Sequence, residues 1–289
     1  MTVNTCDFDK LRRLSADIRI ETIRAISNFG MGHIGGAISI ADVLAVLYGD
    51  ILKIDPKNPQ WEDRDWLVLS KGHSGPGLYV ALALKGYFDK EMLKTLNQPG
   101  TKLPSHCDRL KTPGIDMTTG SLGQGISCAL GVAMGMRMQG RANRVYCILG
   151  DGELQEGQVW EAVQCAAHNN VDNLTLLVDF NKIQLDGKLE SICRPYDLVA
   201  KFTAFGLAAE MVKGYSVEDI HAGIQRAIAV KGRPAVVILD TYKGLGCNFA
   251  EQASFNHYMS IDKEMADGAI AEIEKRFAAG TYPGGDFKW

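Results

Sequence analysis

Residues 149–160 read LGDGELQEGQVW and give the strongest single indication of the fold. They follow RVYCIL, residues 144–149, which has the composition of a short buried strand, and they lead into a helix expected from about Glu156. A strand that ends in Gly-Asp-Gly ahead of a helix places small residues and an acid where parallel sheets bind ligands. Such a turn suits a metal ion or a phosphate group, although a plain surface turn has a similar composition.

The overall composition is typical of a globular protein with a large core. The chain has 289 residues, of which 46% are hydrophobic and 22% charged. A formal net charge of -3 provides no electrostatic footprint for nucleic acid or an anionic membrane. No segment approaches the ~20 apolar residues needed to span a bilayer, and the first ten residues lack a secretory signal. We therefore expect a cytoplasmic protein that binds neither nucleic acid nor membranes.

The seven cysteines are scattered, odd in number and form no CxxC pair. Several of them, such as Cys128 and Cys147, fall inside apolar runs. This pattern predicts reduced thiols in the core and argues against a disulfide framework or a zinc site.

Apolar strands and amphipathic helices alternate along the chain. The expected strands are residues 65–70, 144–149, 174–180 and 235–240, and the expected helices are residues 7–28, 39–48, 124–139, 157–169 and 216–230. The strand runs are continuously apolar, as in parallel strands that are covered on both faces. The sequence predicts a single α/β domain over residues 1–289, with a doubly wound, mainly parallel sheet, in which residues 261–289 form a closing helix and a tail.

Three polar loops follow the expected strands, at residues 70–75, 150–157 and 179–187. Ligands bind outside the carboxyl ends of such strands, so these loops are expected to share one site. Asp151 and Asn181 offer hard oxygen ligands of the kind that Mg²⁺ prefers. Gly150 and Gly152 would let the backbone approach a phosphate group at the amino end of the following helix.

These motifs resemble a known family. GDG at 150–152 followed by NKI at 181–183 resembles the cofactor motif of the thiamine diphosphate-binding fold. MGHIGG (31–36), SKGH (70–73) and TTGSLGQG (118–125) resemble transketolase in particular, and the resemblance extends over about residues 10–260. Transketolases are normally more than twice this length. The chain therefore resembles the amino-terminal, diphosphate-binding subunit of a split transketolase.

The resemblance implies a role for each matching residue in cofactor binding. Asp151, Asn181 and the backbone carbonyl of Ile183 would hold Mg²⁺, or Ca²⁺ or Mn²⁺ in its place. The residues implied to contact thiamine diphosphate are His73, Gly120, Ser121, Leu122, Gly152, Asn181 and His257. Ser121 stands where the family usually has proline.

Catalytic roles are implied in the same way. His33 and His106 match histidines that contact the hydroxyls and carbonyl of the donor sugar, and His257 matches a histidine near the reaction centre. Glu156 matches a glutamate at the dimer interface that couples paired active sites. Ile34 and Tyr258 replace residues that are Pro and Gly in the family, which suggests a reshaped substrate channel.

One further acid and two further histidines are expected to have no role in binding or catalysis. Glu153 is expected to be a solvated acid in the turn, and His168 and His221 are expected to be structural residues within helices.

The chemistry of the family explains a pocket rich in histidine. Cleavage of the C2–C3 bond of a ketose leaves a two-carbon carbanion equivalent, for which the thiazolium ring is an electron sink. Imidazoles exchange protons with hydroxyls near neutral pH. In this family the glutamate that activates the cofactor, and the basic residues that bind a substrate phosphate, lie in the next domain. We therefore expect a separate pyrimidine-domain subunit, joined in a dimer of heterodimers that acts on sugar substrates.

The leading hypothesis is transfer of a two-carbon ketol group from an anionic ketose to an aldose. The alternatives are the alpha subunit of a 2-oxoacid dehydrogenase, a fragment similar to deoxyxylulose phosphate synthase, or an inactive scaffold. The pair His33 and His106 argues against the dehydrogenase, and the intact Asp151 and Asn181 argue against a scaffold. The sugar itself stays open among pentose phosphates, a branched sugar and a sulfo-sugar.

Overall fold

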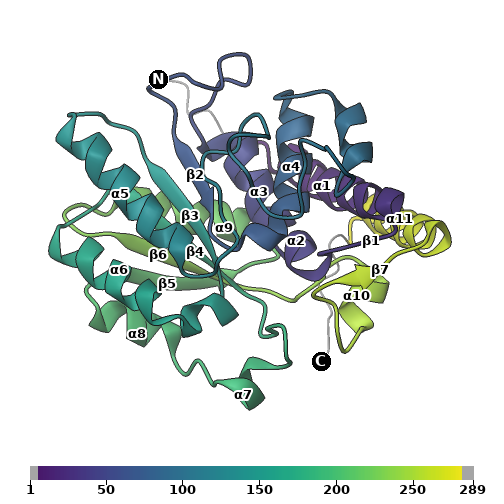
Figure 1. Cartoon of the computed structure of the whole chain (residues 1–289). Coiled ribbons are helices and arrows are strands. Elements are labelled where there is room, and N and C mark those ends of the chain that lie inside the picture. The colour runs from purple at the N-terminus through teal and green to yellow at the C-terminus, as the bar shows by residue number, and fades with distance from the viewer. Residues whose placement is uncertain (1–5, 282–289) are drawn as a thin grey trace.

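The computed structural model describes residues 6–281. Its central sheet contains the strands β2 (Trp66–Leu69), β3 (Val145–Gly150), β4 (Leu174–Phe180), β5 (Ala208–Lys213) and β6 (Ala235–Asp240). All four neighbouring pairs are parallel, in the order β2-β3-β4-β6-β5 (Figure 1). The carboxyl ends of all five strands therefore meet at one edge of the sheet.

Helices cover both faces of this sheet. One apolar cluster contains residues from α1 (Phe8–Phe29), α3 (Ala41–Val46), α4 (Gly75–Lys85), α9 (Val217–Ala229) and α11 (Lys263–Ala278). The other contains residues from α5 (Gln124–Met138), α6 (Gly157–His168) and α8 (Leu198–Ala204). Successive strand residues point to opposite faces, so Leu67 and Leu69 join the first cluster while Val68 joins the second. The predicted doubly wound parallel sheet is confirmed.

A two-stranded ribbon lies apart from the main sheet and joins distant parts of the chain. Strand β1 (Met31–Gly32) pairs antiparallel with β7 (Met259–Ser260), and Gly32 lies opposite Met259 (Figure 1). His33 follows β1 and Tyr258 precedes β7, so this pairing makes them neighbours, with their rings in an edge-to-face arrangement.

The expected strands are all present, and residues 174–180 and 235–240 match β4 and β6 in full. The edge strand β5 escaped prediction because most of its residues are only partly buried. The helix expected at 39–48 is divided into α2 (Gly35–Ser39), α3 and the π-helix η1 (Leu47–Ile51). The remaining short elements are η2 (Gly72–Ser74), η3 (Lys90–Thr95), η4 (Gly152–Gln155), α7 (Leu189–Ile192) and α10 (Asn248–Gln252).

The closing helix expected within residues 261–289 is α11, and the tail beyond residue 281 lies outside the described residues. All seven cysteines are free thiols. Cys147 is buried as expected, but the expected core position is wrong for Cys128, Cys165 and Cys193, which are exposed. Within residues 6–281, no helix is long and apolar enough to cross a membrane.

Candidate active site

The carboxyl edge of the sheet opens into a pocket of about 310 Å³, which the three predicted loops share with the β1–β7 ribbon. The predicted site residues that line it are His33, His73, His106, Gly120, Leu122, Asp151, Gly152, Glu156, Asn181, Ile183 and His257. Ser121 does not line the pocket, and its side chain is exposed. Ile34 is fully buried in the core, so the replacement at this position does not change the pocket wall directly.

The three predicted metal ligands meet where β3 and β4 end, because Gly150 pairs with Asp179 in the sheet. Asp151 accepts a hydrogen bond of 2.5 Å from the backbone N–H of Lys182, which ties the GDG turn to the loop after β4. The Asn181 side-chain oxygen accepts from the N–H of Ile183 at 3.1 Å. A carboxylate, an amide oxygen and a backbone carbonyl thus come together, and these are hard ligands suited to Mg²⁺.

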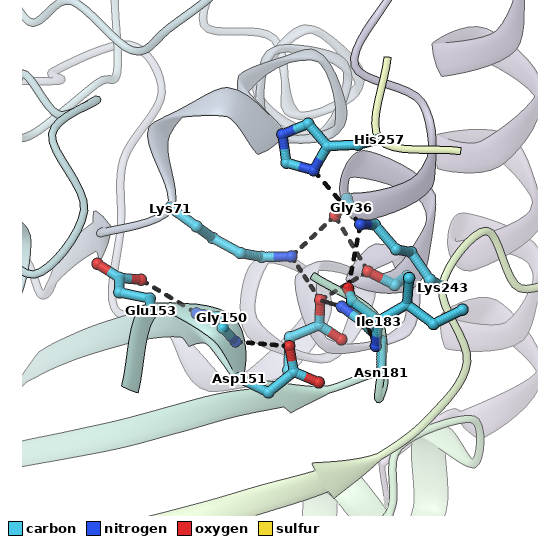
Figure 2. Close-up of polar contacts among 12 residues, drawn as sticks. Gly36, Lys71, Gly150, Asp151, Glu153, Asn181, Ile183, Lys243 and His257 are labelled. Atoms are coloured by element: carbon cyan, nitrogen blue, oxygen red, sulfur yellow. Dashed lines mark hydrogen bonds and ion pairs between the residues drawn. The ribbon is translucent and has the colours of Figure 1, made fainter. Parts of the chain in front are cut away.

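Lys243 is a residue of the site that the motif analysis missed. Its ammonium donates to the carbonyl of Ile183 at 3.0 Å and lies 3.3 Å from Nδ1 of His257 (Figure 2). The residue is 3% exposed, and burial lowers the pKa of Lys243 to about 8. Its position shortly after the apolar strand β6 was the available signal, because that strand ends at the same edge of the sheet.

Lys71 provides a second buried ammonium group. It donates to a carboxylate oxygen of Asp179 at 2.5 Å and to the carbonyl of Gly36 at 3.0 Å (Figure 2). The same carboxylate oxygen accepts hydrogen bonds from the side chains of Ser39 and Asn181. Asp179 therefore holds the amide of a predicted metal ligand in place from inside the core.

Glu153 is not the solvated turn acid that the sequence suggested, since only 1% of the residue is exposed. The short helix η4 turns its carboxylate inward, where it accepts hydrogen bonds from Ser70 Oγ at 2.5 Å, from the N–H of Gly123 at 2.8 Å and from the N–H of Gly150 at 3.0 Å. Burial raises the pKa of Glu153. One side chain thus joins the loop after β2, the segment that opens α5, and the GDG turn.

Four histidines form a cluster on the side of the pocket facing the ribbon. The ring centroid of His33 lies 5.3 Å from those of His106 and His257 and 5.5 Å from that of His73. Burial and neighbouring cationic or imidazole groups lower the pKa of His33 to about 4 and that of His257 to about 3. Burial also lowers the pKa values of His73 and His106. At neutral pH these rings are neutral, so each has one nitrogen that donates a hydrogen bond and one that accepts one.

Two further features complete the pocket wall. A methyl group at Gly152 would lie 2.8 Å from Cβ of Gln184, so glycine keeps the GDG turn open at this point. Glu156 precedes α6 and is exposed at the pocket rim. His168 and His221 lie outside this pocket, as expected of structural residues.

A doubly wound parallel sheet with a polar, glycine-rich pocket at its carboxyl edge defines the class of α/β proteins that bind ligands at the ends of their strands. Residues 11–277 match the family described as "Transketolase, thiamine diphosphate binding domain". The chain belongs to the transketolase family.

Two relatives have nearly the same length as this chain. It is 48% identical over 261 residues to "6-deoxy-6-sulfo-D-fructose transketolase subunit SqwG" of Clostridium sp. (strain MSTE9), covering 90% of this chain and 95% of the relative. It is 35% identical over 269 residues to a protein of Actinobacillus succinogenes named as one subunit of an apulose-4-phosphate transketolase, covering 92% and 97% of the two chains.

Solved transketolases share the fold but are longer. The enzyme from Leishmania mexicana superposes with a TM-score of 0.86 at 28% identity, covering 96% of this chain and 42% of that one. The enzyme from Campylobacter jejuni gives a TM-score of 0.85 at 30% identity, covering 96% and 44%. This chain thus spans less than half the length of those solved structures.

Proposed function

We propose that this chain is the diphosphate-binding half of a split transketolase and that it acts with a separate pyrimidine-domain subunit. The observation that carries the proposal is the convergence of His33, His106 and His257 on the pocket that also contains Asp151 and Asn181. The near-complete coverage of relatives named as subunits supports a division of the enzyme between two polypeptides.

The residues present fit thiamine diphosphate and a divalent cation. Lys71 and Lys243 bring two buried ammonium groups to the pocket, where a diphosphate would contribute negative charge. The second carboxylate oxygen of Asp179 is buried without a hydrogen-bond partner, close to Asn181. A cation held by Asp151, Asn181 and the Ile183 carbonyl would balance these oxygens, with Mg²⁺ as the expected ion and Ca²⁺ or Mn²⁺ as substitutes.

Bound thiamine diphosphate would supply the electron sink for cleavage of the C2–C3 bond of a ketose. On this chain, the backbone of Gly152 and Gly120 would approach the cofactor and Leu122 would flank it, while the exposed Ser121 would contact only a part of the cofactor that extends beyond the pocket. His73 would contact the cofactor from the histidine cluster.

The other three histidines would act on the substrate. His33, His106 and His257 would orient the ketose and its reacting hydroxyls through hydrogen bonds to their neutral rings. Glu156, exposed at the rim, would face a neighbouring subunit in the dimer of heterodimers.

We extend the proposal to one folded domain over residues 1–289 and, because all seven thiols are free, to a reducing cytoplasmic location.

The matching family and the two relatives described above are transketolases, which does not favour either alternative enzyme class. An inactive scaffold has no physical need for buried cations and oxygen ligands around a pocket. We propose an anionic ketose as donor, and a 6-sulfonated fructose is the first candidate because the 48% identical relative carries that name.

The test is a panel of donors offered to the chain with its partner subunit, thiamine diphosphate and Mg²⁺. We expect ketol transfer to an aldose from 6-deoxy-6-sulfo-D-fructose or from xylulose 5-phosphate, and no decarboxylation of pyruvate. Pyruvate decarboxylation without ketol transfer would overturn the proposal in favour of the oxidative branch.

A further inference from the structure

A second cavity lies beside the histidine cluster. It has a volume of about 720 Å³, within the range of small-molecule sites. Its walls come from Phe29, at the end of α1, from Tyr258, just before β7, and from part of the loop between them in space, namely Asn97, Gln98, Gly100, Thr101, Lys102, Pro104, Ser105, Leu110 and Lys111. No residue that the resemblance assigned to the cofactor, the metal ion or catalysis lines it.

Two side chains separate this cavity from the candidate active site. Ser105 lines the cavity, and its hydroxyl lies 3.2 Å from Nδ1 of His33. Tyr258 lines the cavity too, and its ring centroid lies 4.9 Å from that of His33 in an edge-to-face arrangement. The β1–β7 ribbon fixes this arrangement because Gly32 pairs with Met259. A substrate that reaches His33 is thus within one side chain of the cavity.

The charge of the cavity has a single sign. Lys102 and Lys111 line it, and no carboxylate does. Lys102 forms no ion pair with any residue in the described part of the chain. The ammonium of Lys111 lies 4.0 Å from Asp108, a distance at which an exposed pair is weak. Neutral groups able to donate hydrogen bonds line the same walls, namely Asn97, Gln98, Thr101 and Ser105.

The loop that carries these lysines is held in place before any ligand arrives. The hydroxyl of Thr112 donates to the carbonyl of Lys102 at 2.5 Å, and that of Thr101 accepts from the N–H of Leu103 at 2.9 Å. The hydroxyl of Tyr79, in the helix α4, donates to the carbonyl of Pro104 at 2.8 Å. A preorganised loop costs less conformational entropy on binding, so two exposed lysines on it contribute more than on a free loop.

We propose that this cavity binds the tetrahedral anionic end of the sugar substrate, a sulfonate or a phosphate. Lys102 and Lys111 would neutralise the anion, while the ketose end passes Tyr258 to reach His33. The inference rests on the proposed function and deepens it. It gives this chain its own part in recognising the charged end of the substrate, a task that the resemblance placed in the partner's domain.

The kinetic test uses the complete complex with the double variant Lys102→Gln/Lys111→Gln. The measured quantity is the ratio of kcat/KM for an anionic ketose, 6-deoxy-6-sulfo-D-fructose or fructose 6-phosphate, to kcat/KM for the neutral ketose L-erythrulose. Because the double variant loses charge-assisted hydrogen bonds to the anion, we expect this ratio to fall about tenfold or more. The fall should appear mainly in KM. Lys231→Gln, an exposed lysine ahead of β6, is the matched control and should leave the ratio unchanged. An unchanged ratio in the double variant, with folding intact by circular dichroism, would overturn the inference.

Equilibrium binding separates this inference from the proposed function. Binding of the same two anionic sugars to the complex is measured without turnover, for the wild type and the double variant. Anion binding that depends on the lysines, without ketol transfer from any donor, would contradict the proposed function and keep the inference. Ketol transfer combined with anion binding that is unchanged in the double variant would support the proposed function and contradict the inference. Comparing the two sugars shows whether the cavity prefers sulfonate or phosphate.

Discussion

Lys71 and Asp179 form a buried ion pair under the candidate active site, with the ammonium nitrogen 2.5 Å from a carboxylate oxygen. The lysine comes from the loop after β2 and the aspartate from near the end of β4. Because the same carboxylate oxygen accepts from Asn181, the pair connects the core of the sheet to a proposed metal ligand. Stability and function are therefore expected to depend on the same contact.

Removing one member of this pair leaves the other charge buried. We expect Lys71→Met to lower the free energy of unfolding by about 3–5 kcal/mol. The double variant Lys71→Met/Asp179→Leu should lose less free energy of unfolding than the sum of the losses of the two single variants, since no unpaired charge remains buried. Chemical denaturation of the three variants measures this. A cost below about 1 kcal/mol for Lys71→Met would show that the pair is not buried in the folded protein.

Glu153 offers a second test of buried polar contacts. Replacement by Gln keeps the size but aims an amide N–H₂ group at one of the three donors. We expect a loss of about 1–3 kcal/mol in the free energy of unfolding. The matched control is Glu161→Gln on the exposed side of α6, which should stay within about 0.5 kcal/mol of the wild type. Equal effects of the two substitutions would contradict the inward position of Glu153.

The lowered pKa of His33 predicts how stability changes with pH. Its folded-state pKa is about 4, against about 6.5 for an unfolded histidine. Below pH 6.5 the unfolded chain takes up a proton that the folded chain does not, so this contribution to stability is complete above pH 6.5 and is lost as pH falls towards 4. Urea unfolding at several pH values should give a steeper dependence for the wild type than for His33→Asn. Identical slopes would show that His33 titrates normally.

The metal proposal predicts the behaviour of an aspartate variant. Asp151→Asn removes the charged ligand and should weaken binding of thiamine diphosphate in the presence of Mg²⁺ by at least about tenfold, as should removal of the ion with a chelator. Asp186→Asn, an exposed acid in the loop after β4, serves as the control. Calorimetric titration of the complex with thiamine diphosphate measures the dissociation constant for each variant and for the wild type. Undiminished binding by the Asp151 variant would place the ion elsewhere.

The sequence predicted those features that depend on local pattern. The central strand β4 was located in full because a parallel strand buried on both faces is continuously apolar. The edge strand β5 is half-exposed and lacks that signal. The motif spacing predicted the meeting of Asp151 and Asn181, because neighbouring parallel strands end together.

Contacts between segments far apart in the chain could not be read from the pattern. The burial of Glu153 depends on Ser70 and Gly123, which lie in two other loops. The place of Lys243 against Ile183 likewise depends on the order of strands in the sheet. The exposed position of Cys128 follows from which face of α5 is covered, and an apolar helix with little amphipathic character does not reveal this.

The central claim is that this chain supplies one half of a ketol-transferring site. The most direct measurement is ketol transfer from an anionic ketose, with thiamine diphosphate and Mg²⁺, by the chain alone and during titration with the pyrimidine-domain subunit. We expect no turnover by the chain alone and activity that rises to a plateau at equal amounts of the two subunits. Full activity of the purified chain without a second polypeptide would contradict the claim.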